Sequence, residues 1–224
     1  MKTPAVQPRK KSTPASNARI NDPERTKEDI LEIATHAFAR DGLTGSRIND
    51  IGGLTAASKR MIYYYFENKE GLYRAVLERC YADIRSREEA IGVEDLPPEE
   101  ALAQLVRLKF TYHMEHPEFV RLVMVENIHQ GEHMRYLKEA RTRGLFALQQ
   151  LTRILQRGAD SGVFRKDVRP IDVHTSISAL CFYNVSNRWT VAHLLEHDMG
   201  DVTHAASRRE AVVDEILRLC RLKV

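Results

Sequence analysis

The sequence predicts an all-α protein, in which a three-helix N-terminal unit containing a helix-turn-helix precedes a larger helical bundle with a dimerisation face. Apolar residues recur at three- and four-residue spacing along almost the whole chain, which is the period of an amphipathic helix. No strand-like alternation of useful length and no internal repeat interrupts this pattern. The 11 glycines and 8 prolines among 224 residues are too few for a collagen-like or wholly disordered chain.

The charge distribution separates a basic N-terminal tail from a nearly neutral remainder. The net charge is +3, from 34 Lys and Arg against 31 Asp and Glu, which excludes a protein that binds nucleic acid by bulk charge but allows a local basic patch. Residues 1–21 are basic, without acids, and offer almost nothing apolar to bury, so we expect this tail to be disordered. It is either a solvated leader or an arm that contacts DNA phosphates.

Neither a membrane segment nor a disulfide framework is expected. The tail lacks the apolar stretch of a signal peptide, and the longest uncharged stretch, 173–187, is too short and too polar to span a bilayer. Cys80, Cys181 and Cys220 are odd in number and lie far apart, without zinc-ligand or redox spacing. The sequence therefore predicts reduced thiols in a cytoplasmic protein.

The helices are expected in the following order. The first begins at Pro23, a residue favoured in the first turn, and ends at Asp41-Gly42, because glycine commonly follows a helix end. Two short helical pieces lie within 46–66, and a longer helix begins near Asn68. After a break at 91–98, further helices are expected at 98–115, 117–130, 132–161, 170–196 and 203–222. The last two carry broad apolar stripes, which suit either a core or half of a subunit interface.

The segment 46–66 has the pattern of two short capped helices joined by a tight turn. Ser46 is a suitable N-cap for a helix whose Ile48 and Ile51 face inward, and Ser58 is placed to cap a second helix. Ile62 and Phe66 lie four residues apart on one face of that second helix. This arrangement is typical of a helix-turn-helix.

The opposite face of the second helix combines basic and aromatic side chains. Lys59, Arg60, Met61, Tyr63 and Tyr64 lie there with few acids nearby. Such a surface has the chemistry needed to enter a DNA major groove. At the start of the next helix, backbone N–H groups and the Lys69 ammonium group could meet a phosphate together.

Residues 23–80 resemble the DNA-binding domain of the tetracycline-repressor (TetR) family of bacterial transcription regulators. The residues that carry the resemblance are Gly42, Gly45-Ser46-Arg47, Asp50-Ile51, Ser58, Ile62-Tyr63-Tyr64-Tyr65-Phe66 and Asn68-Lys69-Glu70-Gly71-Leu72. The resemblance implies that Ser46, Tyr64 and Lys69 hold phosphates. It also implies that Arg47, Lys59, Arg60, Met61 and Tyr63 face bases or nearby backbone. With Ser58, these residues form the candidate DNA-binding set.

Two short stretches depart from the family's usual pattern. Thr55-Ala56-Ala57 stands where the family usually has Ala-Gly-Val before the capping serine. A left-handed turn at Ala56 would cost roughly 1–2 kcal/mol. Gly52-Gly53 replaces an ordinarily Ala-rich helix end, which should make that end easier to fray.

Two histidine pairs have the spacing of metal ligands. His193, Glu196 and His197 match an H-x-x-E-H pattern, in which both histidines would share a helix face and hold zinc. His129 and His133 repeat the spacing, with Glu126 nearby. Because such short patterns arise readily in helices, we expect no metal at either place. No phosphate-binding glycine loop or Gly-x-Ser-x-Gly turn is present, so we expect neither a cofactor nor an enzyme.

The resemblance places an effector pocket between helices of the second half. Pockets of this kind are mostly apolar, with a few polar anchors. The candidates are Phe110, His113, Met114, Met124, Asn127, Phe146, Phe182, Asn184 and Trp189. Asn127 and Asn184 are the most informative, since a buried amide needs a hydrogen-bonding partner.

The resemblance implies a sequence-specific regulator with a DNA-binding domain over 22–68 and an effector-binding and dimerisation domain over 69–224. We expect a homodimer, formed by the last two helices, that binds a palindromic double-stranded DNA operator and is released by a small molecule. A cytoplasmic, nucleoid-associated bacterial protein without membrane contact is implied. The alternatives are a regulator that answers to a protein partner and a helical metal-dependent hydrolase. An apolar cavity in the second half would favour a regulator that responds to a small molecule. A filled core there would favour one that responds to a protein partner.

Overall fold

The computed structural model describes residues 22–55 and 57–222, and the predicted all-α fold is confirmed over these ranges. The helices are α1 (Pro23–Gly45), α2 (Ile48–Leu54), α3 (Lys59–Phe66), α4 (Lys69–Ala90), α5 (Pro98–Glu115), α6 (Pro117–Ile128), the short 3-10 helix η1 (Met134–Tyr136), α7 (Lys138–Asp160), α8 (Pro170–Ser186), α9 (Arg188–Leu194) and α10 (Val202–Cys220). The predicted disordered tail and the turn conformation of Ala56 lie outside the described residues.

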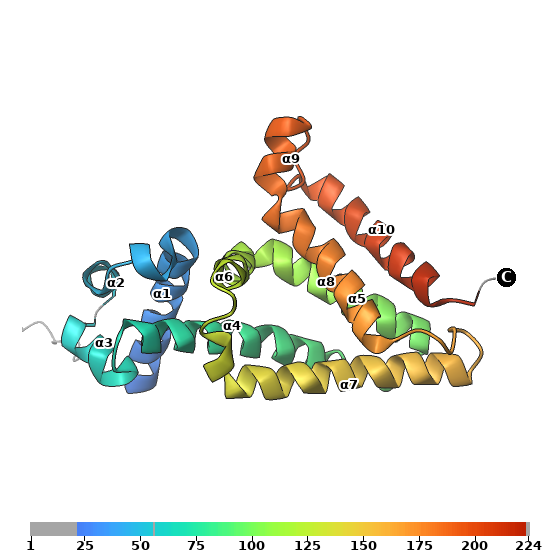
Figure 1. Ribbon diagram of the computed structural model, residues 1–224, viewed down its shortest axis with the longest axis horizontal. Helices are drawn as coiled ribbons and strands as arrows, with labels where there is room; N and C mark the ends of the chain where they lie inside the picture. Colours follow the sequence, from blue (N-terminus) through green and yellow to red (C-terminus); the bar gives the residue numbers. More distant parts are fainter. Residues whose placement is uncertain (1–21, 56, 223–224) are drawn as a thin grey trace, which may run out of the picture.

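The helices form a small unit at one end and a larger bundle at the other (Figure 1). α1, α2 and α3 make the small unit, and α4 leads from it into the bundle, where α7 packs along it. α5, α8 and α10 pack together, and α9 with the end of α8 projects from the rest of the molecule. The predicted arrangement of a three-helix unit before a helical bundle is therefore present.

Three predicted boundaries in the second half differ from the structure. The helix expected over 117–130 ends at Ile128, because Gln130 and Gly131 adopt positive φ angles of 56° and 67°. The helix expected from residue 132 begins at Lys138, after η1. The helix expected over 170–196 is two helices, which break at Asn187, where the side-chain amide donates to Ser186 Oγ (2.8 Å).

The predicted end of the first helix at Gly42 is matched by a kink. Gly42 adopts φ 68° and ψ 178°, outside the helical region, although helical bonding resumes as far as Gly45. Only glycine takes this conformation without steric cost. The kink turns the chain toward α2.

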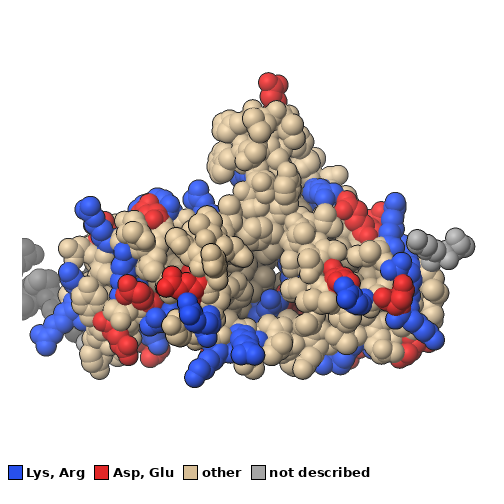
Figure 2. Space-filling model, in the orientation of Figure 1, with Lys and Arg blue, Asp and Glu red and all other residues tan. Residues whose placement is uncertain are grey.

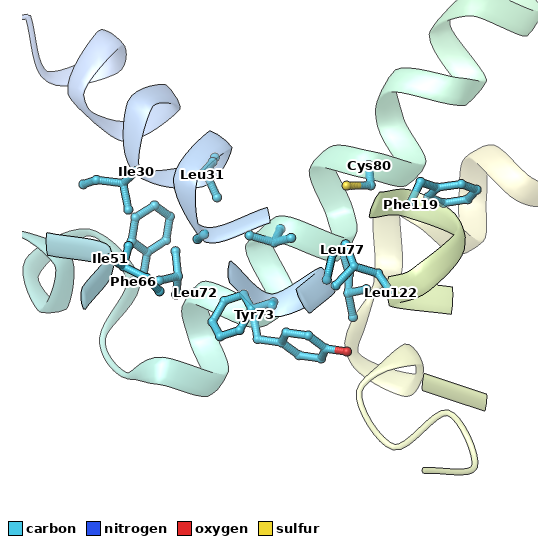
Figure 3. Close-up of a cluster of buried hydrophobic side chains, with 14 of the residues drawn as sticks. Ile30, Leu31, Ile51, Phe66, Leu72, Tyr73, Leu77, Cys80, Phe119 and Leu122 are labelled. Carbon is cyan, nitrogen blue, oxygen red and sulfur yellow. The ribbon is translucent and has the colours of Figure 1, made fainter. Parts of the chain in front are cut away.

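One hydrophobic core joins the small unit to the bundle (Figure 3). It draws residues from α1 to α4 and from α6, so it is continuous across the expected domain boundary between residues 68 and 69. At its centre, the fully buried rings of Phe38 and Tyr73 meet edge to face, with centroids 5.1 Å apart. Edge-to-face packing is a favoured geometry for aromatic rings. The position of α1 to α3 is therefore coupled to α4 and α6.

A second core fills the space between α5, α7, α8 and α10. The inward stripes of the last two long helices lie in it, with Ile177 and Ile216 almost fully buried. These stripes are core within one chain, so they are not free to form the subunit interface that the sequence allowed. The three cysteines are buried and unpaired, which agrees with the predicted reduced thiols.

A charged cluster is buried where α4 meets α5. Glu88 is 2% exposed and forms ion pairs with Arg85 and with the Lys109 ammonium group (3.2 Å). Burial opposes ionisation of Glu88, but Lys109 and Arg85 outweigh it and lower the pKa of this carboxyl group. One turn along α5, burial and then the Lys109 charge lower the pKa of His113 to about 4, so its ring is neutral at pH 7.

Replacing His113 by Phe should flatten the pH dependence of stability. His113 takes up a proton near pH 6.5 when unfolded but only near pH 4 when folded. Between pH 7 and pH 5 the unfolded state binds more protons, so the free energy of unfolding falls as pH falls, by about 2 kcal/mol from this residue. Urea unfolding at fixed protein concentration measures the difference. The exposed His129→Phe is the matched control, and an equal pH dependence in wild type and His113→Phe would contradict this account.

Candidate DNA-binding surface and effector pocket

The second helix of the helix-turn-helix, α3, is fixed by its cap and by two buried side chains. Ser58 Oγ accepts a hydrogen bond from the Met61 backbone N–H (3.2 Å), as predicted for an N-cap. Ile62 and Phe66 are buried against the core, and so are Ile48 and Ile51 of α2. The inward faces of both short helices were therefore correctly predicted.

The outer face of α3 consists of basic and aromatic side chains. Lys59, Arg60, Tyr63 and Tyr64 are exposed, and Tyr64 is 82% exposed, which is high for an aromatic ring. The Lys59 ammonium group lies 5.7 Å from the centroid of the Tyr63 ring, within cation–π range. Figure 2 shows basic groups, interspersed with acids, at the end of the molecule formed by α1 to α3. This face therefore exposes hydrogen-bond donors and aromatic rings that a DNA groove could accept, but it does not carry a large net positive charge.

Ser46 and Met61 are placed differently from the prediction. Ser46 is buried, and its hydroxyl donates to the carbonyl oxygens of Gly42 (2.8 Å) and Ala37 (3.1 Å). The N-cap of α2 is the exposed Arg47, which makes no side-chain capping bond. Met61 is half-buried against the core, at the edge of the exposed face rather than on it. Ser46 thus secures the α1 kink, and its hydroxyl is not presented to DNA.

The turn from α3 to α4 is tightly constrained. Glu67 has a positive φ of 66°, and Asn68 Oδ1 accepts from the Gly71 backbone N–H (2.7 Å). A Cβ at Gly71 would lie 2.0 Å from the Phe66 carbonyl oxygen, so the helices can approach this closely only with glycine there. Lys69, half-buried, donates from Nζ to the Thr44 carbonyl oxygen (3.4 Å). Its charge therefore lies between the α1 kink and the start of α4.

A cavity of about 570 Å³ lies between the end of α1, α6 and the end of α8. Four of the predicted effector residues, Met114, Met124, Asn184 and Trp189, line it. The volume is within the range typical of small-molecule sites. The α1 residues in its wall, among them His36 and Arg40, were missed, because helical periodicity does not show that α1 packs against α6.

The other five predicted effector residues do not line this cavity. Phe110 and His113 are buried in the interior, and Phe182 packs against the first core. Asn127 is exposed and donates to the Val123 carbonyl oxygen of its own helix (2.8 Å). Phe146 is exposed on α7. Aromatic and amide residues at helical spacing look alike in sequence whether they pack, face solvent or line a pocket.

Asn184 is the polar anchor of the cavity. It is 1% exposed, and its Nδ2 donates to Met114 Sδ (3.2 Å) and to the Met199 carbonyl oxygen (3.4 Å). Its Oδ1 is buried without a hydrogen-bond partner among the described residues. A buried acceptor without a partner carries a desolvation cost, which a donor on a bound molecule would remove.

Comparison with known proteins gives matches to both halves of the chain. Residues 30–76 match the family described as bacterial regulatory proteins, tetR family, and residues 98–216 match the tetracyclin repressor-like C-terminal domain. The chain is 35% identical over 206 residues to the HTH-type transcriptional repressor NicS of Pseudomonas putida, and this match covers 92% of this chain and 97% of NicS. The chain belongs to the TetR family. It is a DNA-binding transcription regulator.

Other relatives agree with the assignment to the TetR family. The HTH-type transcriptional repressor SCO4008 of Streptomyces coelicolor is 39% identical over 110 residues, 49% of this chain and 54% of that protein. The ketosteroid regulator KstR2 of Mycobacterium tuberculosis has a TM-score of 0.68 at 20% identity, over 92% of this chain and 98% of KstR2. FadR of Bacillus subtilis, solved in complex with stearoyl-CoA, has a TM-score of 0.64 at 20% identity, and the match covers 83% of this chain and 97% of FadR. The structural matches show a shared fold.

The helix faces on which both metal patterns depended do not form. α9 ends at Leu194 and Glu196 has a positive φ of 52°, so His193 and His197 do not share a helix face. His197 Nε2 instead lies 3.1 Å from His204 Nδ1. In the region of the second pattern α6 ends at Ile128, and His133 Nδ1 pairs with the buried Glu126 carboxylate (3.0 Å), while His129 is exposed. Among the described residues, no group of three or more His, Cys, Asp or Glu could hold a metal ion.

Membrane-spanning segments can be assessed directly from the helices. Over residues 22–55 and 57–222, no helix is both long enough and apolar enough to cross a bilayer.

Replacing Arg60 and Lys69 by Ala should weaken DNA binding in two distinguishable ways. Arg60 lies on the outer face of α3, so Arg60→Ala should relax sequence preference at one base position by about 1–3 kcal/mol. Lys69 lies at the start of α4, near the Thr44 carbonyl oxygen, where we expect it to meet a DNA phosphate. Lys69→Ala should therefore weaken binding to all DNA sequences, and it should lower the slope of log affinity against log salt concentration by about 1. Fluorescence-anisotropy titrations with matched and mismatched duplexes over a salt series measure both effects.

The exposed Lys166→Ala, between α7 and α8, is the control and should change neither quantity. Uniform weakening by Arg60→Ala would argue against base contact by Arg60. An unchanged salt slope for Lys69→Ala would remove Lys69 from the phosphate contacts.

Proposed function

We propose that this TetR-family regulator is a repressor that binds a palindromic operator as a homodimer and leaves it when a small molecule occupies the α1/α6/α8 cavity. The observation that carries the proposal is that one cavity wall belongs to the DNA-binding unit and the rest to the bundle. A molecule bound there contacts both parts of the protein at once.

The DNA-contacting set is Arg47, Lys59, Arg60, Tyr63, Tyr64 and Lys69, with Ser58 at the cap of α3. α3 enters the major groove, and the start of α4 meets a phosphate. Because this patch is small and mixed with acids, two copies are needed for firm binding. Two-fold symmetry then requires half-sites separated by a whole number of helical turns, about 10 bp each.

The outer faces of α8 and α10, extended by α9, form the dimer interface in this proposal. Exposed apolar side chains gather on this side of the bundle: Ile171, Tyr183, Trp189, Leu194, Leu195, Val202 and Leu219. The projection formed by α9 and the end of α8 shows almost no charged groups on the face in Figure 2. Apolar patches of this kind commonly mark protein–protein contacts. A second copy of the chain covers them.

The effector acts through differential affinity for two conformations. Only a ligand that binds one conformation better than another can shift an equilibrium between them. α1 packs on both α4 and α6, so a ligand that moves α1 relative to α6 changes the position of α3 in each subunit. A changed separation of the two α3 helices no longer fits the operator.

Two observations favour a small molecule over a protein partner as the signal. A cavity of small-molecule size lies between α1, α6 and α8, beside the filled core of the second half, and a relative of the same fold, FadR, was solved in complex with an organic ligand, stearoyl-CoA. NicS and SCO4008 are both named as repressors, which supports repression. The protein would act in the bacterial cytoplasm at the nucleoid, without enzymatic activity and without a cofactor. The basic tail remains a proposed DNA-contacting arm.

Operator release by a cavity-bound compound tests the proposal. Trp189 is the one tryptophan of the chain and lines the cavity, so its fluorescence should change as an effector binds. A compound library is screened by this signal, and each hit is then added to the protein–operator complex. We expect hits to lower operator affinity at least tenfold, about 1.4 kcal/mol.

Asn184→Leu should weaken the binding of those compounds that carry a hydrogen-bond donor, because the substitution removes the unpartnered Oδ1 acceptor. The matched control is Asn127→Leu, an amide on the solvent face of α6, which should leave effector binding unchanged. Hits that change Trp189 fluorescence but leave operator affinity unaltered at saturation would contradict release.

A further inference from the structure

A smaller cavity lies between α4, η1 and the first half of α7. Its volume is about 220 Å³, below the range of drug-sized sites. Leu137, Ala140 and the ring of Tyr81 give it apolar walls, and two arginines, Arg85 and Arg141, also line it. No acid lines this cavity among the described residues. The two cavities share no lining residue, so this one is separate from the proposed effector cavity.

Arg85 is a half-buried cation that shares its acidic partner with a lysine. Its side chain is 12% exposed, and its Nη1 pairs with Glu88. Glu88 is shared with Lys109, so two cations have one carboxylate between them. Arg85 Nε is buried without a hydrogen-bond partner among the described residues. Glu88 can neutralise only one of these two cations, so an anion beside the Arg85 guanidinium group at the cavity would supply the missing countercharge.

The groups behind Arg85 support a positive local potential. The pKa of His113 and that of His174 are each lowered to about 4, first by burial and next by the charge of Lys109. Both rings are neutral at pH 7, so the local positive charge comes from Lys109 and Arg85 and not from these histidines. Asp83 and Glu139 are the acids closest in sequence to the lining residues, but neither lines the cavity. The carboxylate of Glu78, one turn before Tyr81 on α4, accepts a hydrogen bond from the Ala140 backbone N–H (2.9 Å).

Arg141 adds a second cation at the exposed side of the cavity. It is exposed on α7 and forms no ion pair with an acid among the described residues. Two guanidinium groups around a small apolar space match a carboxylate attached to a short apolar body, because arginine binds carboxylates through two parallel hydrogen bonds. The apolar walls favour an organic anion over inorganic phosphate.

We propose that the cavity lined by Arg85 and Arg141 binds a small organic carboxylate. Lys109 and Glu88 hold the Arg85 guanidinium in place from behind, and Arg141 closes on the anion from the solvent side.

Gly144 supplies a way to test the site without removing a buried charge. It lines the cavity, and a Cβ built on it meets no atom within 4 Å, so a larger side chain has room there. Leucine also forms helix better than glycine. Gly144→Leu should therefore fill the cavity while leaving the thermal unfolding temperature unchanged or higher. Gln149→Leu, at an exposed position on the same helix, is the matched control.

Isothermal titration of the full chain with benzoate, benzamide and inorganic phosphate at constant ionic strength tests the proposal. Benzoate and benzamide differ in the charge and donor pattern of one group, and phosphate is an anion without an apolar body. We expect benzoate to bind saturably and both other probes to bind at least tenfold more weakly. Gly144→Leu should abolish benzoate binding and Arg141→Gln should weaken it, whereas Gln149→Leu and Asn184→Leu should leave it unchanged.

Several results would overturn the proposal. Absence of benzoate binding, equal binding of benzamide, or equal binding of phosphate would each reject an organic carboxylate site. Full benzoate binding by folded Gly144→Leu would show that the anion binds elsewhere, and its loss in Asn184→Leu would assign it to the α1/α6/α8 cavity. None of these results bears on operator binding, which is measured separately.

Discussion

The packing of Phe38 of α1 against Tyr73 of α4 is the contact on which the rest of the structure depends. Around this pair, one continuous core holds α2 and α3 on one side and α6 on the other. The helix that carries the proposed DNA-contacting residues Lys59 to Tyr64 is therefore not an independent module attached by a linker. Its position follows α1 and α4, and α1 in turn forms a wall of the larger cavity.

Features set by local rules could be predicted from the sequence. Ser58 is recognisable as a cap and Ile62 as an inward residue, because both depend on neighbours within one helical turn. The α1/α6/α8 cavity could not be predicted, because it depends on which distant helices meet. The role of Ser46 was missed because it depends on the kink at Gly42, which lets the hydroxyl reach the carbonyl oxygens of α1. The helix break at Asn187 was also missed, since a single side-chain bond to Ser186 leaves no pattern in the sequence.

Asn184 and Arg85 are two of the residues whose buried polar atoms lack a hydrogen-bond partner among the described residues. Asn184 keeps an unpartnered acceptor at the larger cavity, and Arg85 keeps an unpartnered donor near the smaller one. Both carry a cost in the unliganded protein that a bound molecule of complementary chemistry would remove. Arg85 belongs to α4, the helix that connects the DNA-binding unit with the bundle, and the larger cavity has a wall in α1, which packs on α4. Both cavities are therefore bordered by α4 or by a helix packed on it.

The central claim is that two copies of α3 read one operator in register. Selection of DNA by the purified full-length protein from a random pool measures this most directly, because it returns both sequence and symmetry. The account predicts an enriched two-fold symmetric site whose half-sites are separated by a whole number of turns, about 10 bp each. Enrichment of a single asymmetric half-site, or of no sequence at all, would contradict it.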